Sequence, residues 1–201
     1  MKHSSTRALF EYWNRRRGRG RAPERSDGDP ADIRHILGDT FMLAADFVDE
    51  IRFRLAGTRV CALFAREIKG EAFNDLWGAT NRQHIGAVLT SVIVESEGVV
   101  AGALGRTEDG VGIELELLLL PLAFDGRTRI RALGVLAPLT PPYWLGERPV
   151  VELDLRTLRH IEAERSLVAP HFGRLQDGPR ARHGFLVYSG GRKLPADERT
   201  S

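Results

Sequence analysis

Hydrophobic residues recur along the chain at two spacings, one typical of helices and one typical of strands. Leu9 and Trp13 lie four residues apart within 5–17, so this segment is predicted to form a helix with one apolar side. Asp29 and Pro30 suit the cap and the first turn of a second helix. Further helices are expected over 60–64, 73–77 and 80–95, the last with hydrophobic residues at clear helical spacing.

Alternation of hydrophobic and polar residues predicts the strands. It is clearest where Ile51, Phe53 and Leu55 alternate with two arginines, a pattern typical of a half-buried strand. The five expected strands cover 41–47, 51–55, 99–104, 111–120 and 129–136. Tight glycine-containing turns between the last three predict antiparallel neighbours. The predicted fold class is therefore α+β, a five-stranded antiparallel sheet with helices on one face and an N-terminal helical extension.

The chain divides into four expected parts. A helical extension with an arginine-rich loop covers 1–38, and the α+β domain covers 39–146. A C-terminal extension follows over 147–170, and a tail covers 171–201. Gly, Pro, Arg, Asp and Ser dominate this tail, so we expect it to be mobile. The sequence leaves open whether 150–155 adds a strand to the sheet.

The composition is that of a globular protein in a reducing compartment. Hydrophobic residues make up 42% of the chain, and Cys61 is the only cysteine, so no intrachain disulfide can form. The apolar run over 115–124 contains Glu116 and Pro121 and is shorter than the roughly 20 residues of a spanning helix. Residues 1–10 lack the apolar core of a signal peptide. We therefore expect a cytoplasmic protein without a membrane span.

A set of short motifs is spread over residues 9–146. It comprises Tyr12-Trp13 with the Arg/Gly run after it, Pro23, Arg25, Asp29-Pro30, Arg54-Leu55-Ala56-Gly57-Thr58, Phe64, Gly70, Trp77, Arg131-Ala132-Leu133-Gly134, Pro141 and Trp144-Leu145-Gly146. Together with the order of the expected elements, this set resembles a bacterial family of small single-domain PAS proteins, formerly a domain of unknown function. PAS domains often carry glycine after the Leu-Phe pair, and here the residue is Ala65. The resemblance implies a non-enzymatic sensory or regulatory role in bacterial signal transduction, with no established catalytic residues.

In the PAS fold, the short helices form one wall of a ligand pocket. The residues expected to line it are Phe64, Phe73 and Trp77 from the helices and Leu115, Leu117, Leu133 and Val135 from the sheet. A small molecule could bind among them. The alternative is that the same side chains only pack the core, which would make this a ligand-free interaction domain.

The residues that could hold a cofactor or do catalysis are few. Light-sensing relatives keep a flavin-reactive cysteine near Cys61, but the Asn, Arg and Gln that would hold flavin are absent, which favours a buried structural thiol. His84 on the long helix could bind haem, as a helical histidine does in some PAS proteins, but an exposed or hydrogen-bonded histidine explains it more simply. Glu114 and Glu116 are expected on one solvated face of a strand. No histidine spacing predicts a metal site, and we expect no enzyme activity.

The most charged segment holds six arginines: Arg15, Arg16, Arg17, Arg19, Arg21 and Arg25. They could bind a nucleotide, a nucleic acid or a protein partner, or pair with acidic neighbours and fix the N-terminal helix. No aromatic residues interrupt the run, which weakens the nucleic-acid interpretation. A sensor without its own output domain must signal by contact. We expect Leu9, Tyr12 and Trp13 to form the surface that binds a protein partner or a second copy.

Overall fold

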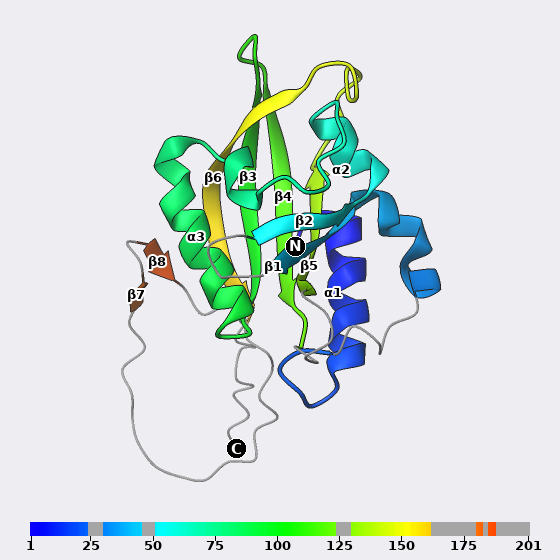
Figure 1. The fold of residues 1–201 in the computed structure, drawn as a ribbon, viewed down its shortest axis with the longest axis vertical. Helices are drawn as coiled ribbons and strands as arrows, with labels where there is room; N and C mark the ends of the chain where they lie inside the picture. Colours follow the sequence, from blue (N-terminus) through cyan, green and yellow to red (C-terminus); the bar gives the residue numbers. More distant parts are fainter. Residues whose placement is uncertain (24–29, 46–50, 124–129, 162–179, 183–184, 188–201) are drawn as a thin grey trace, which may run out of the picture.

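The computed structural model describes residues 1–23, 30–45, 51–123, 130–161, 180–182 and 185–187 (Figure 1). Its centre is a six-stranded antiparallel sheet with the strand order β2-β1-β5-β4-β3-β6. The strands are β1 (Thr40–Ala45), β2 (Ile51–Ala56), β3 (Gly98–Thr107), β4 (Gly112–Pro121), β5 (Ile130–Pro138) and β6 (Val150–Ile161). The α+β class expected from the sequence is confirmed.

The sixth strand answers the question that the sequence left open. β6 pairs with β3 along its whole length, from Gly98 opposite Ile161 to Thr107 opposite Val150. It lies within the expected C-terminal extension, so this part of the chain belongs to the sheet. In the expected tail, the described residues are β7 (Arg180–Arg182) and β8 (Phe185–Val187), which pair with each other. The remainder of 171–201 lies outside the described residues.

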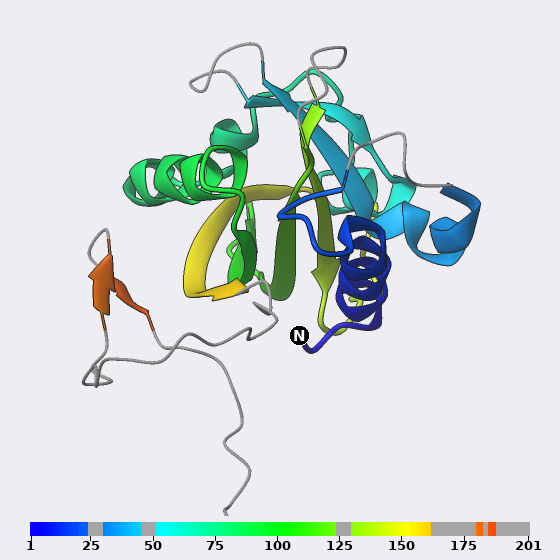
Figure 2. The same cartoon turned by 90° about the horizontal axis from the view of Figure 1, so that it is seen from below.

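Helices cover both faces of the sheet, which corrects the expectation of helices on one face (Figures 1 and 2). One face carries the α-helix α2 (Thr58–Leu63), the 3-10 helix η3 (Phe73–Leu76) and the α-helix α3 (Ala79–Ile93), and we call it the α3 face. The other carries α1 (Ser4–Arg17) and the 3-10 helix η2 (Pro30–Asp39), and we call it the α1 face. The reason lies in β4, which is buried without interruption from Leu115 to Pro121, as a strand covered on both sides must be.

The core of the α3 face is built around four aromatic rings. The ring centroids of Phe41 and Phe53 lie 5.4 Å apart, those of Phe53 and Phe73 5.5 Å, and those of Phe73 and Trp77 6.0 Å. These separations are in the range at which aromatic pairs attract one another. Each of the four side chains is 2% exposed or less. Strands β1 and β2 and helix η3 are therefore held by one shared cluster.

The apolar side of α1 packs against the α1 face of the sheet. Leu9 is 0% exposed, Tyr12 8% and Trp13 2%, and the indole N–H of Trp13 donates to the Pro121 carbonyl at 2.7 Å. These side chains belong to one core with residues of β4 and β5 such as Leu118. Because the sheet itself covers this side of the helix, it cannot also be the exposed partner surface expected from the sequence.

Two glycines of the sequence motifs stand where backbone segments approach closely. A Cβ atom at Gly134 would lie 2.2 Å from the Phe41 ring and 2.8 Å from the Leu118 carbonyl oxygen. At Gly57 it would lie 2.1 Å from the Leu37 carbonyl oxygen. Both distances are too short for a side-chain carbon, so these positions require glycine.

Candidate functional site

The expected pocket residues divide between the two faces of the sheet. Five of them belong to the α3-face core: Phe64, Phe73, Trp77, Leu115 and Leu117. Leu133 and Val135 belong to the core beneath α1. Side chains alternate along β5, so Ala132 and Leu136 face α3 in their place. A single pocket therefore cannot contain all seven residues.

Helix η3 and its C-cap residue Trp77 hold two buried polar atoms that have no hydrogen-bond partner among the described residues. Trp77 is 1% exposed, and its indole Nε1 has no hydrogen-bond partner among the described residues. The side-chain oxygen Oδ1 of Asn74, three residues earlier, is also buried without a partner there. A buried polar group left unpaired costs about 1–3 kcal/mol. This turn thus offers one donor and one acceptor from within an otherwise apolar wall.

The main chain around Trp77 is firmly held. Its N–H donates to the Asn74 carbonyl at 3.2 Å, and its own carbonyl accepts from Nε of Arg82 at 3.1 Å. Trp77 also forms a parallel bridge with Leu153 of β6. These contacts on both sides of Trp77 fix the position of this turn in the folded domain.

Cys61 lies on α2 and is half-buried beside the same core. Its Sγ lies 3.5 Å from Oε1 of Glu67 and 4.0 Å from the Ala56 carbonyl oxygen. Burial raises the pKa of the Cys61 thiol, and the Glu67 carboxylate adds to the increase. The thiolate is the reactive form of cysteine, so a raised pKa fits a structural thiol. His84, on α3, is half-exposed.

Two of the arginines at the end of α1 make contacts within the chain. Nη2 of Arg16 lies 2.6 Å from Oδ2 of Asp32, and its guanidinium lies 5.6 Å from the centre of the Tyr12 ring. The Arg17 guanidinium lies 5.1 Å from the centre of the Trp13 ring. These positions in the last helical turn also suit the negative end of the helix dipole. This part of the segment stabilises the helix.

The other arginines differ. Arg15, Arg19 and Arg21 are exposed and form no hydrogen bond or ion pair with any described residue. Arg25 lies outside the described residues. The arginines available for a ligand are therefore a subset of the six that the sequence suggested.

Glu116 is a buried carboxylate that the sequence misplaced on a solvated surface. Glu114 is exposed as expected, but Glu116 is 6% exposed because the residues before α1 cover it. The Lys2 N–H lies 2.7 and 3.0 Å from its two oxygens, and the His3 N–H lies 2.9 Å from Oε1. Burial alone would raise the pKa of Glu116, but these backbone hydrogen bonds outweigh it and lower the pKa.

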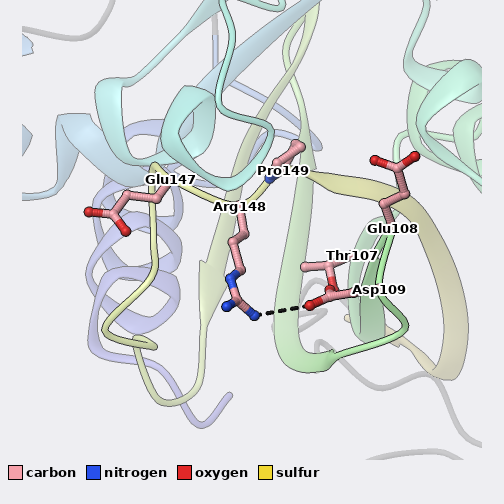
Figure 3. A pocket seen from close by; sticks show the side chains of 6 residues that line it. All are labelled: Thr107, Glu108, Asp109, Glu147, Arg148 and Pro149. Carbon is pink, nitrogen blue, oxygen red and sulfur yellow. Dashed lines mark hydrogen bonds and ion pairs between the residues drawn. The ribbon is translucent and has the colours of Figure 1, made fainter.

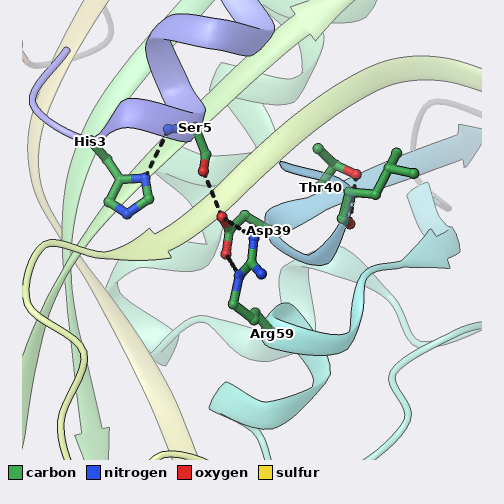
Figure 4. Close-up of polar contacts among 6 residues, drawn as sticks. His3, Ser5, Asp39, Thr40 and Arg59 are labelled. Carbon is green, nitrogen blue, oxygen red and sulfur yellow. Dashed lines mark hydrogen bonds and ion pairs between the residues drawn. The ribbon is translucent and has the colours of Figure 1, made fainter. Parts of the chain in front are cut away.

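A second carboxylate fixes the same end of α1 (Figure 4). Oδ2 of Asp39 accepts from the Ser5 hydroxyl at 2.6 Å, and Arg59 donates to both carboxylate oxygens at 2.6 and 2.8 Å. Asp39 is 4% exposed. Burial would raise its pKa, but the hydrogen bonds from Arg59 and Ser5 outweigh that effect and lower the pKa. Asp39 thereby joins α1 to α2 across the edge of the sheet.

A surface cleft of about 450 Å³ lies between the β3–β4 turn and the segment before β6 (Figure 3). Nη1 of Arg148 reaches across it to Oδ2 of Asp109 at 3.0 Å. Glu108 and Glu147 point away from this pair. Asp109 also accepts from the Thr107 hydroxyl, so the charges of Asp109 and Arg148 in this cleft are paired with each other.

Among the described residues, no group of three or more His, Cys, Asp or Glu side chains could hold a metal ion. None of the described helices is long and apolar enough to cross a membrane.

A family model described as a PAS domain matches residues 1–137. No curated protein matches the chain. Among solved structures, the chain is similar to a light-oxygen-voltage domain studied with a flavin analogue, at 14% identity and a TM-score of 0.44, over 56% of this chain and 85% of that one. It is also similar to a PAS domain from Colwellia psychrerythraea, at 18% identity and a TM-score of 0.38, over 55% and 97% of the two chains. A PAS domain of an HTR-like protein from Haloarcula marismortui is 18% identical with a TM-score of 0.38, over 49% and 80%.

Proposed function

The chain belongs to the PAS domain family, and from this premise we propose that it is a non-enzymatic sensory protein of bacterial signal transduction. It works in the cytoplasm and uses neither flavin nor haem. It senses a small molecule in the α3-face interior and passes its state on by contact with a protein partner or a second copy. The contact surface lies elsewhere than on the buried side of α1.

The observation that carries the sensing role is the unpartnered pair on η3. An indole N–H and an amide oxygen are buried on one turn, in a wall that is otherwise apolar. Buried polar groups in folded proteins nearly always have partners, so an exception indicates a bound water, ion or ligand, or a functional reason. The rings of Phe53, Phe73 and Trp77 pack against one another in this wall, with centroids 5.5 and 6.0 Å apart, so the ligand we propose is a small polar molecule and not a large cofactor.

Native mass spectrometry on the freshly purified chain, with an absorbance scan, tests this role. We expect a retained small molecule that is lost in Trp77→Phe, which keeps an aromatic ring but removes the N–H donor. Trp144→Phe is the matched control, because Trp144 is 5% exposed and belongs to the same core. A wild-type chain without any retained mass would contradict ligand sensing and leave contact as the sole mode of action. The same spectrum reports whether the chain is a dimer.

A second function is favoured by the exposed arginines Arg15, Arg19 and Arg21, which have no partner among the described residues. In this alternative the chain is a regulator that binds a nucleotide or a nucleic acid. Its binding should weaken with salt, and replacing the three arginines with glutamine should reduce the slope of log K against log salt by about 3. The control replaces three other exposed arginines, Arg34, Arg54 and Arg159, and should not change the slope. Binding that is insensitive to salt would exclude this alternative.

A further inference from the structure

Strand β6 is the edge strand of the sheet, next to β3, and α3 lies near it on the same side of the molecule (Figures 1 and 2). It also lies beyond residues 1–137, the part matched by the family model. An added strand needs only its partner β3 to extend the sheet. β6 makes a second set of contacts in addition, one at each end of α3.

The first junction is at the start of α3 and combines a main-chain hydrogen bond with side-chain contacts. Gly78, which cannot cap the helix with a side chain, donates its N–H to the Leu153 carbonyl at 3.1 Å. Nδ2 of Asn81 donates to Oδ1 of Asp154 at 3.3 Å. The Glu152 carboxylate lies so close that a Cβ atom at position 78 would be 2.5 Å from Oε1. β6 thus supplies acceptors and negative charge to a helix N-terminus that has no side-chain cap of its own.

The second junction is at the end of α3 and consists of side chains. Nδ1 of His160 lies 2.8 Å from Oε2 of Glu97, in the turn that leads from α3 to β3. The Ser91 hydroxyl, on the last turns of α3, lies 3.3 Å from the same carboxylate oxygen and 3.4 Å from the same histidine nitrogen. Both contacts converge on Nδ1, whereas a catalytic serine and acid would use the two different ring nitrogens. The cluster therefore connects β6 to the end of α3 and to the turn that follows it.

The two junctions differ in strength. Leu153 is 1% exposed at the first, whereas the His160 and Glu97 side chains are 17% and 35% exposed at the second. Partly exposed side-chain pairs contribute less than buried main-chain bonds, because water competes for their partners. The junction at His160 should open first, with the junction at Leu153 acting as the pivot.

We infer that β6 is a clasp that holds α3 at both ends and transmits movement of this helix to the last residues of the strand. Four side chains fix α3 in the α3-face core, each 5% exposed or less: Ile85, Val88, Leu89 and Val92. A change in that core that shifts α3 strains the His160 joint and loosens 156–161, from which the chain continues. Within the proposed sensory function, on which this use of the clasp rests, the C-terminal segment receives the signal.

Hydrogen–deuterium exchange on the full chain at neutral pH, without added ligand, tests the clasp. His160→Ala should speed exchange about tenfold in two places together, residues 156–161 and residues 90–97, and leave 150–154 unchanged. Glu97→Gln keeps the size of the side chain and should give the same pattern at smaller amplitude. Arg159→Ala is the control, since Arg159 is exposed, neighbours His160 and points to the other face of the sheet by the alternation of side chains along a strand.

The coupling itself is tested from the core. Val88→Ala, on the buried side of α3, should also speed exchange in 156–161, through the movement of the helix. If His160→Ala loosens 156–161 without affecting 90–97, the strand end merely frays and the clasp is wrong. Unchanged 156–161 in Val88→Ala would equally overturn it. Because no ligand is used, these outcomes are independent of whether a small molecule is sensed.

Discussion

The two faces of the sheet are closed by different physical means. The α3 face is closed by apolar packing, in which four aromatic rings join strands and helix η3. The α1 face is also apolar at its centre, but the start of α1 depends on two buried carboxylates, Asp39 and Glu116. Apolar packing does not respond to protonation, whereas hydrogen bonds to a carboxylate do. We therefore expect the α3 face to set the stability of the domain, and α1 to act as a cover that can be released.

The largest effect on stability is expected from removing one ring of the aromatic cluster. Phe73→Ala removes a ring that lies within 6.0 Å of three others, and it should lower the free energy of unfolding by about 3–5 kcal/mol. The loss should appear in a single cooperative transition in urea, because β1, β2 and η3 share the cluster. If the wild-type chain already unfolded in two separate transitions, one for each face, the aromatic cluster would not set the stability of the whole domain.

The matching truncation on the other face is Leu9→Ala. Leu9 is 0% exposed, so the substitution should cost about 2–4 kcal/mol, but mainly by releasing α1. Amide exchange should rise across 4–17 while the β3–β4 hairpin stays protected. An environment-sensitive dye should bind the uncovered sheet. Equal loss of protection in both places would show that α1 is part of the same cooperative unit as the α3 face.

A smaller effect on the same cover is expected from Glu116→Gln. The amide cannot accept as strongly from the Lys2 and His3 N–H groups, and we expect a loss of about 1–3 kcal/mol confined to α1. Glu114→Gln is the control, because Glu114 is two residues earlier on the same side of β4 and is exposed. Exchange across 4–17 should rise in the first variant and stay unchanged in the second. If exchange across 4–17 rose in both variants, any loss of negative charge on this face would destabilise α1, and the hydrogen bonds of Glu116 would have no special role.

The same carboxylates predict a dependence on pH. The folded pKa values of Asp39 and Glu116 are lowered, so each carboxylate stabilises the fold above the pKa of the unfolded chain, about 4. That stabilisation is lost as pH falls through the folded pKa. The measurement is the free energy of unfolding from pH 7 to pH 3, for the wild type and for Asp39→Asn with Glu116→Gln. The difference between them should shrink as pH falls, and a constant difference would contradict the assignment.

The sequence predicted the helices and strands well, but it predicted less well which of them pack against each other. The spacing of Leu9 and Trp13 shows that α1 has an apolar side, but such a pattern is the same whether a sheet or another protein covers it. The run from Leu117 to Leu120 held a usable signal, since continuous apolar residues indicate a strand buried on both faces. Glu116 was a second signal, because a carboxylate between apolar residues of such a strand indicates a buried charge that needs hydrogen-bond donors. The unpartnered N–H of Trp77 could not be predicted, because pairing depends on coordinates.

The smallest effect concerns Ala65, the position where PAS domains often carry glycine. Its φ of 49° lies in the left-handed region, which strains a residue with a Cβ atom by roughly 1–2 kcal/mol. Glycine removes that strain but gives the unfolded chain more freedom, so Ala65→Gly should raise the stability by a net amount of about 0.5–1 kcal/mol. Because Ala65 follows Phe64 of the α3-face core, the gain should appear in the global transition in urea and leave the pH-dependent difference at α1 untouched.

Ala62→Gly provides the control for this substitution. Ala62 lies inside α2, where glycine should cost about 0.5–1 kcal/mol, so the two substitutions should move the stability in opposite directions. If both lowered it, the local strain at Ala65 would already be offset by contacts of its methyl group. A gain that appeared only in the exchange of α1 would contradict the division of the molecule into a face that sets stability and a cover that can be released.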